Sequence, residues 1–306
     1  MKDPYLLHMF NPTKNVSPFD VNMAYEAEFD GVIPYSEVAL DDIHALTQDT
    51  IFSRGKKGVK RTGIFIGGRE FGLAIDMLNR AKTAMVPPFE VSVFADPSGA
   101  ITTAAAVMAC IEEQLKRKSD ESLEGKRVDI IGGTGPVGVC AGILAANCGA
   151  KVYLTSRRGT KVATEYANEY NARFGVEMYG ADSSTEEKVM EYLPDTHIVI
   201  GAAKAGIQVL SKTQLQQASN LQIAADVNAV PPLGIEGVDV FDMGTELSDT
   251  PEKAWGLGAL AIGDVKYKVH FKMFEMMKKT DEPLYLDHEK AFDIAREFAA
   301  KIRVFS

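Results

Sequence analysis

Cysteine is scarce in this sequence: there are three among 306 residues, at Cys110, Cys140 and Cys148. Three cysteines in a chain of this length do not make a disulfide framework, so we expect a reducing, cytoplasmic location. All three lie in or just after stretches with helical spacing. We interpret them as small apolar side chains packed in helices rather than as catalytic thiols.

Long apolar runs, basic charge and metal-ligand patterns are also missing. No apolar run approaches the ~20 residues of a membrane span, and the first residues, MKDPYLLHMFNP, lack the cleavage site of a signal peptide. The formal net charge of -9 argues against duplex nucleic acid or an anionic membrane as the main partner. The five histidines have no metal-ligand spacing, so we expect no bound metal.

The sequence does contain a regular alternation of strand-like and helix-like stretches. The strands predicted in the first third are YLLHMF, GVIPY, TGIFIGG and FEVSVFAD, and helical spacing fills the segments between them. A long predicted helix, ITTAAAVMACIEEQLKRK, is followed by the polar stretch KSDESLEGK, which we take as the domain boundary. The alternation resumes at KRVDIIGG and predicts parallel sheets with helices on both faces.

The segment IGGTGPVG links a predicted strand to a predicted helix and contains the pattern G-x-G-x-x-G at Gly133, Gly135 and Gly138. In this context the first glycine permits a tight turn, the second lets the backbone approach a pyrophosphate, and the third allows close helix packing. The phosphates would lie at the start of the helix, near Thr134, Pro136 and Val137. The pattern therefore predicts a dinucleotide site, with a plain glycine-rich turn as the alternative.

The end of the next predicted strand indicates which dinucleotide binds. An NAD enzyme usually places a carboxylate about 20 residues past the loop, whereas an arginine accommodates the 2′-phosphate of NADP. This sequence has Ser156, Arg157, Arg158 and then Lys161 at that point, without a carboxylate. We therefore predict NADP. The alternative is a solvated basic turn.

Seven blocks in order carry a resemblance to a known family: SPFDVNMAYEA, LTQDTIFSR, TGIFIGG, FADPSGAITTAAA, GGTGPVG, ADVNAVPPLGI and GALAIGDVKYK. Together they resemble the bacterial NAD(P)-dependent methylene-tetrahydromethanopterin dehydrogenases of one-carbon metabolism. The resemblance implies a two-domain α/β enzyme in which a Rossmann-type NADP domain accompanies an N-terminal pterin-binding lobe. We expect the lobe over 1–120, the NADP domain over 121–269, and 270–306 packed back on the lobe.

The resemblance also implies a reaction, in which hydride leaves the methylene carbon between two nitrogens of tetrahydromethanopterin and reaches NADP. The product is a delocalised amidinium cation, so no general base is required, which agrees with the absence of a recognisable His/Asp or Ser/His motif. Some family members accept both NAD and NADP. The resemblance further suggests a homo-oligomer and a role in the formaldehyde oxidation of methylotrophy.

Candidate site residues follow from the same blocks. Asp20, near Ser17 in SPFDVN, is the candidate for pterin contact, and Lys266 in GDVKYK matches a lysine that the family carries at its active-site cleft. For Asp20 the alternative is a carboxylate early in a helix that is favoured by the helix dipole, and for Lys266 it is a surface lysine. Further candidates are the cofactor-side residues Gly201, Ala202, Asp226 and Asn228, at strand ends, and the hydroxyls of Thr102 and Thr103, which either face the substrate or only cap a helix.

Two other functions stay open at this point. The pterin could be tetrahydrofolate, although its glutamate tail would favour a basic rim over the acidic balance of this chain. A non-catalytic NADP-binding protein would keep the Rossmann domain alone, and the intact N-terminal blocks argue against it.

Overall fold

A computed structural model describes residues 3–302 and divides them into two compact units. The first unit contains the described residues up to Thr102 together with 267–294, and the second contains 103–266 together with the described residues from Ala295. The division thus falls inside the long helix α5 (Ala100–Ser119), earlier than the expected boundary at residue 120, because α5 from Thr103 onward packs with the second unit. No helix of the described residues has both the length and the apolar character needed to cross a bilayer.

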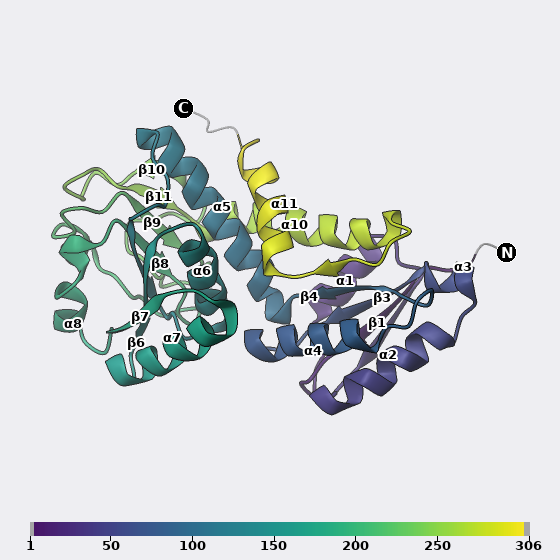
Figure 1. Ribbon diagram of the computed structural model, residues 1–306. Coiled ribbons are helices and arrows are strands. Elements are labelled where there is room, and N and C mark those ends of the chain that lie inside the picture. The colour runs from purple at the N-terminus through teal and green to yellow at the C-terminus, as the bar shows by residue number, and fades with distance from the viewer. Residues whose placement is uncertain (1–2, 303–306) are drawn as a thin grey trace. The chain divides into compact units, whose positions relative to one another are not determined.

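The first unit is built on a parallel five-stranded sheet in the order β12-β4-β3-β1-β2 (Figure 1). Its strands are β1 (Leu6–Phe10), β2 (Gly31–Tyr35), β3 (Thr62–Ile66), β4 (Ser92–Ala95) and β12 (Tyr285–Leu286). Its helices are α1 (Pro18–Glu26), η1 (Leu40–Asp42), α2 (Ile43–Phe52), α3 (Lys56–Val59), α4 (Phe71–Ala84) and η2 (Pro97–Gly99), with parts of α10 (Ala259–Lys279) and α11 (His288–Ala299).

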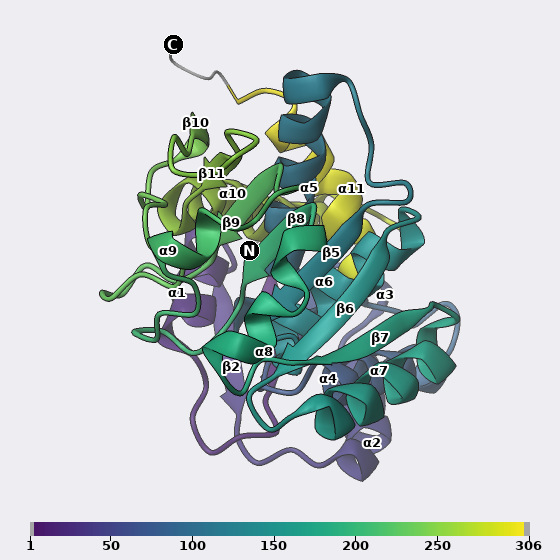
Figure 2. The same cartoon turned by 90° about the vertical axis from the view of Figure 1, so that its left-hand side faces the viewer.

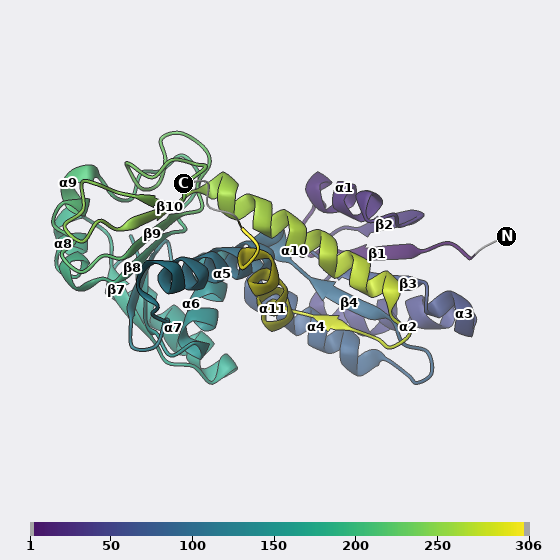
Figure 3. The same cartoon turned by 90° about the horizontal axis from the view of Figure 1, so that it is seen from above.

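The sheet of the first unit is covered on both faces, with α1 and α10 on one face and α2 and α4 on the other (Figure 1), and Figure 3 shows α10 crossing over its strands. Strand β3, with the sequence TGIFI, is buried at every position, which is why it reads as a continuous apolar run instead of an alternating one. The ring of Phe274 in α10 packs on Phe65 and Phe94, with ring centroids 5.5 and 5.1 Å away. These contacts place α10 against β3 and β4.

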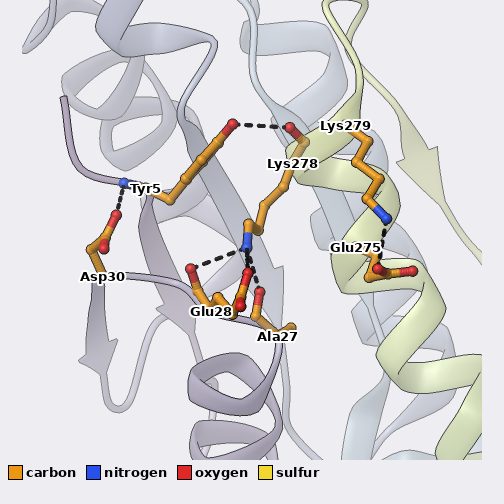
Figure 4. Close-up of polar contacts among 7 residues, drawn as sticks. All are labelled: Tyr5, Ala27, Glu28, Asp30, Glu275, Lys278 and Lys279. Atoms are coloured by element: carbon orange, nitrogen blue, oxygen red, sulfur yellow. Dashed lines mark hydrogen bonds and ion pairs between the residues drawn. The ribbon is translucent and has the colours of Figure 1, made fainter. Parts of the chain in front are cut away.

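The C-terminal end of α10 is fastened to the segment between α1 and β2 (Figure 4). The Lys278 ammonium donates to the carbonyl oxygens of Ala27 at 2.7 Å and Glu28 at 3.1 Å. The Tyr5 hydroxyl donates to the Lys278 carbonyl at 3.2 Å. Segments from both ends of the chain therefore belong to one unit.

The second unit contains a seven-stranded sheet in the order β10-β11-β9-β8-β5-β6-β7 (Figure 2), parallel except where β10 meets β11. Its strands are β5 (Arg127–Ile131), β6 (Lys151–Ser156), β7 (Met178–Asp182), β8 (Ile198–Gly201), β9 (Ile223–Asp226), β10 (Met243–Glu246) and β11 (Trp255–Leu257). Its further helices are α6 (Pro136–Asn147), α7 (Thr160–Phe174), α8 (Glu186–Met190), η3 (Leu193–Asp195) and α9 (Lys212–Leu215).

In each sheet, one strand has a later strand of the chain on either side, so the order of the strands reverses there. Strand β1 pairs with β2 on one side and β3 on the other, and strand β5 pairs with β6 and β8. In open α/β sheets, ligands bind outside the carboxyl ends of the strands at such switch points. The topology therefore points to the residues after β1 and after β5.

The α/β fold class expected from the sequence is confirmed. The alternation of strands and helices is present in both units. The sequence did not predict α3, β10, β11 or β12. These are elements of two to four residues, too short to show a hydrophobic period.

Candidate functional site

A glycine turn joins β5 to α6 in the second unit. Strand β5 ends at Ile131, and α6 begins at Pro136 with Gly135 as its N-cap residue. Gly132 has φ of +82°, a left-handed conformation that glycine adopts without strain. The free N–H groups and the dipole at the start of α6 make this turn suited to an anion.

The roles expected for the three glycines of the G-x-G-x-x-G pattern are distributed differently in the structure. A Cβ on Gly133 would lie 2.8 Å from the Cα of Leu154, so Gly133 lets the loop pack on β6, and the tight turn falls at Gly132 instead. A Cβ on Gly138 would lie 2.6 Å from the Cα of Gly133, which matches the expected close packing of the helix. A Cβ on Gly135 would meet only the Gly132 carbonyl oxygen, at 3.3 Å. Gly135 is therefore the position at which the backbone stays open to a ligand.

A pocket of 440 Å³ opens at the carboxyl ends of β5 and β8. The glycine turn lines it through Gly132, Thr134 and Gly135, and the loops Ser156–Arg158 and Ala202–Lys204 line it from either side. Pro136, Val137 and Gly138 form the first turn of α6 and are not among the residues that line this pocket. The structure thus brings the turn, the basic loop and the end of β8 together around one space.

The basic loop after β6 is organised by Ser156. This serine is 4 % exposed, and its hydroxyl oxygen accepts a hydrogen bond from the backbone N–H of Arg158 at 3.1 Å. The side chains of Arg157 and Arg158 are exposed, and Arg158 lies 5.7 Å from the ring of Tyr166. Lys161 is exposed in the first turn of α7 and does not line the pocket. Two guanidinium groups therefore remain available to an anion beside the pocket.

A second pocket of 450 Å³ continues from the first, sharing Ile131, Arg157 and Val209 with it. Its other walls come from 183–189, after β7, and from 207–214. Ser183 is 8 % exposed, and its hydroxyl has no hydrogen-bond partner among residues 3–302. Because a buried hydroxyl without a partner is unfavourable, this atom is available to hydrogen-bond a polar group in the second pocket.

Asp226, one of the residues expected to bind the cofactor, is held by hydrogen bonds from its own loop. It is 2 % exposed, and its two carboxylate oxygens each accept a backbone N–H at 3.0 Å, from Asn228 and from Ile235. Burial raises the pKa of Asp226, and these hydrogen bonds oppose the increase. A Cβ on Gly201 would lie 3.3 Å from both the Asp226 carboxylate and the Ile235 side chain. Gly201 therefore serves tight packing here, whereas its neighbour Ala202 lines the first pocket.

Asn228 is likewise engaged within the loops. Its amide nitrogen donates to the Pro232 carbonyl at 3.0 Å, and its amide oxygen accepts the N–H groups of Val230 at 3.0 Å and Gly206 at 3.2 Å. The Pro231–Pro232 peptide bond is cis. Asn228 thus joins the loop after β9 to the loop after β8.

In the first unit, Ser17 and Asp20 stand at the start of α1, which follows the switch strand β1. Ser17 is the N-cap residue, yet its side chain makes no capping hydrogen bond. Asp20 lies in the first turn and is only 3 % exposed. Its burial distinguishes it from a solvated carboxylate that merely complements the helix dipole.

The two threonines at the start of α5 differ. The Thr102 hydroxyl is fully buried and donates to the Asp96 carboxylate at 2.6 Å, and it is this carboxylate that accepts the first backbone N–H groups of α5. Thr103 is half-buried. In α10, Lys266 is half-buried, while Lys268 two residues later is exposed.

Comparisons with known proteins agree with this architecture. The family model described as methylene-tetrahydromethanopterin dehydrogenase, N-terminal, matches residues 18–98. The NAD(P)-dependent methylenetetrahydromethanopterin dehydrogenase of Methylorubrum extorquens is 43% identical over 294 residues, covering 96% of this chain and 98% of the relative. The chain belongs to the methylene-tetrahydromethanopterin dehydrogenase family.

Two other known proteins are similar to this chain over most of its length. The bifunctional protein MdtA of Methylorubrum extorquens is 33% identical, covering 96% of this chain and 99% of the relative. The solved structure of shikimate 5-dehydrogenase from Listeria monocytogenes has a TM-score of 0.51 and 16% identity, covering 97% of each chain. The latter likeness concerns the fold alone.

The methylene-tetrahydromethanopterin dehydrogenase fold also reveals site residues that the sequence did not single out. Lys204 and Ala203 line the first pocket, and Ser183 to Glu186 line the second. A general rule could have found them, since both sets follow the carboxyl ends of parallel strands. Within residues 3–302, no group of three or more His, Cys, Asp or Glu side chains is placed to hold a metal ion.

Proposed function

We propose that this protein oxidises the methylene carbon of methylene-tetrahydromethanopterin to the methenyl form with NADP as the hydride acceptor. The observation that carries the proposal is the likeness to a dehydrogenase of this name along nearly the whole of both chains. The two joined pockets of the second unit support the cofactor, and the switch point beside Asp20 supports a ligand in the first unit.

The residues around the two pockets fit a dinucleotide. The open backbone at Gly135 and the first N–H groups of α6 suit a diphosphate, while Arg157 and Arg158 suit a 2′-phosphate. The buried hydroxyl of Ser183 offers a hydrogen bond in the second pocket, where an adenine ring would lie. Bound NADP supplies the carbon that receives the hydride. NAD is proposed as a weaker second cofactor, since it lacks only the group that the arginines hold.

The substrate-side residues have electrostatic and orienting roles. Loss of hydride leaves positive charge spread over two nitrogens, and the Asp20 carboxylate is proposed as its counter-charge or as an acceptor for pterin N–H groups. Lys266 is proposed to orient the pterin or an anionic part of it, with Ser17 and Thr103 as further polar contacts. None of these residues has to remove a proton, because the cation forms by hydride loss alone.

The test is an absorbance assay at the NADPH band, with purified protein and both cofactors. Methylene-tetrahydromethanopterin and methylene-tetrahydrofolate are offered in turn, each with NADP and with NAD. Turnover of the methanopterin substrate with a preference for NADP is expected. Turnover of the folate substrate alone would replace the proposed substrate, and NADPH binding without turnover of either would favour the non-catalytic alternative.

We also propose that the protein is a cytoplasmic homo-oligomer and that it acts in one-carbon metabolism. No disulfide joins Cys110, Cys140 and Cys148, which suits a reducing compartment. Light scattering on the purified protein tests the oligomer, and a monomer mass at micromolar concentration would remove it from the proposal.

A further inference from the structure

A histidine and an aspartate form a fully buried pair in the first unit. Asp96 follows β4 and His270 lies in α10, and both side chains are 0 % exposed. The His270 Nδ1 atom lies 2.9 Å from the Asp96 Oδ2 atom. Neither residue belongs to the substrate-side set named above.

Asp96 also holds the start of α5. One carboxylate oxygen accepts the backbone N–H groups of Ile101 at 2.9 Å and Thr102 at 3.1 Å. The other accepts the Thr102 hydroxyl at 2.6 Å in addition to the histidine. The carboxylate therefore joins three elements, namely the end of β4, the first turn of α5 and the middle of α10.

The His270 ring is enclosed by aromatic side chains. Its centroid lies 5.0 to 6.0 Å from the ring centroids of Phe19, Phe65, Phe94 and Phe274. Phe19 meets the imidazole edge to face at 83°, and it immediately precedes Asp20. The imidazole thus contacts the turn of α1 that carries the proposed pterin carboxylate.

His270 also lies one helical turn after Lys266. Residues four apart on a helix share a face, so a shift or rotation of α10 at His270 moves Lys266 with it. A buried polar pair need not stabilise the fold, because apolar residues of the same volume often give equal or greater stability. What an apolar replacement lacks is the fixed direction of the hydrogen bond to Asp96.

We propose that the Asp96–His270 pair is a positioning device, which fixes the Phe19–Asp20 turn of α1 in the orientation that the substrate requires and holds α10 one turn after Lys266. The inference rests on the proposed function of Asp20 and Lys266. Neither Asp96 nor His270 contacts the pterin in this scheme.

The test compares three variants. H270F keeps an aromatic ring but removes the hydrogen bond, whereas H270N keeps a side-chain N–H donor close to the position of Nδ1. D129N is the matched control: Asp129 is also a 0 % exposed carboxylate, bound to Arg127 and Thr196 in the second unit. Unfolding temperature, NADP affinity, kcat and KM are measured for each, and backbone amide exchange is followed in 17–26 and 259–270.

H270F is expected to lower kcat by about 10- to 100-fold, as a misplacement of about 1 Å does. Its NADP affinity should stay within about twofold of the unaltered enzyme, its amide exchange should speed up in both segments, and H270N should recover most of the activity. D129N should lower the unfolding temperature without this pattern. Loss of activity that follows the unfolding temperature alike in H270F and D129N would overturn the inference.

Amide exchange separates this inference from the proposed function. If the unaltered protein turns over no pterin, the proposed function fails. The inference fails independently if exchange in 17–26 and 259–270 is the same in H270F as in D129N, whatever the activity. Faster exchange only in H270F supports the positioning contact even then.

Discussion

Gly138 and Gly133 lie so close that a Cβ on Gly138 would stand 2.6 Å from the Cα of Gly133, whereas a Cβ on Gly135 would meet nothing nearer than 3.3 Å. The two positions therefore separate packing from binding. G138A is expected to destabilise the protein by about 1–3 kcal/mol, because backbone atoms must move apart. G135A is expected to fold almost normally and to weaken NADP binding by about tenfold or more, because its methyl group stands where a diphosphate approaches. Thermal unfolding and cofactor titration measure both, and equal losses of stability would contradict the distinction.

The two arginines after β6 provide the next prediction. Both guanidinium groups are exposed beside the first pocket, and a hydrogen bond to a charged group contributes about 1.5–3 kcal/mol. The double variant R157A/R158A should therefore raise the NADP dissociation constant by about 100-fold and that of NAD by only a few-fold. Titration with both cofactors checks this, and K161A is the control, since Lys161 does not line the pocket. An equal effect on NAD and NADP would remove the 2′-phosphate assignment.

The thiol of Cys148 should be unreactive near neutral pH. Burial, and next the Glu112 carboxylate, raise its pKa to about 11, although Arg296 opposes the increase. Since only the thiolate is nucleophilic, alkylation by iodoacetamide at pH 7.5 should run about 100-fold or more slower than for free cysteine and accelerate as the pH rises. E112Q should speed the reaction by removing the negative charge. Peptide mass spectrometry follows the site with C148S as the blank, and rapid labelling at pH 7.5 would contradict the prediction.

The main elements of the fold could be predicted because hydrophobic periods and turn residues agree locally. Helix α7 ends where Gly175 adopts a left-handed φ of +67°. Helix α6 begins at Pro136, and proline favours a helix at its first position because the N–H that it lacks has no acceptor within the helix there. Strand β12 could not be predicted, because its two residues, Tyr285 and Leu286, become a strand only by pairing with β4.

The candidate cofactor site could be outlined around the glycine turn and the basic loop, since both are contiguous in the sequence. The hydrogen bonds of Asp226 could not be predicted, for a physical reason. A carboxylate at a strand end is equally suited to a ligand and to a backbone loop, and its acceptance of the Ile235 N–H depends on a fold of the chain nine residues later. The pattern for Thr102 fitted two roles, and its hydrogen bond to the buried carboxylate of Asp96 was not predicted. Contacts between distant segments leave no spacing in the sequence.

Ser183 gives the last prediction, because the same hydroxyl should affect binding and stability in opposite directions. It is buried beside the second pocket without a hydrogen-bond partner among the described residues, so removing it costs the free protein no hydrogen bond. S183A should leave the unfolding temperature unchanged or slightly higher, yet weaken NADP binding by about 5- to 10-fold, the value of a typical hydrogen bond of about 1 kcal/mol. S184A is the matched control, since its side chain is exposed on the same wall. Calorimetric titration with NADP and with 2′-phospho-AMP locates the effect: a loss with both ligands places the hydroxyl at the adenine half. Lower stability with unchanged affinity would mean that the hydroxyl serves the fold instead.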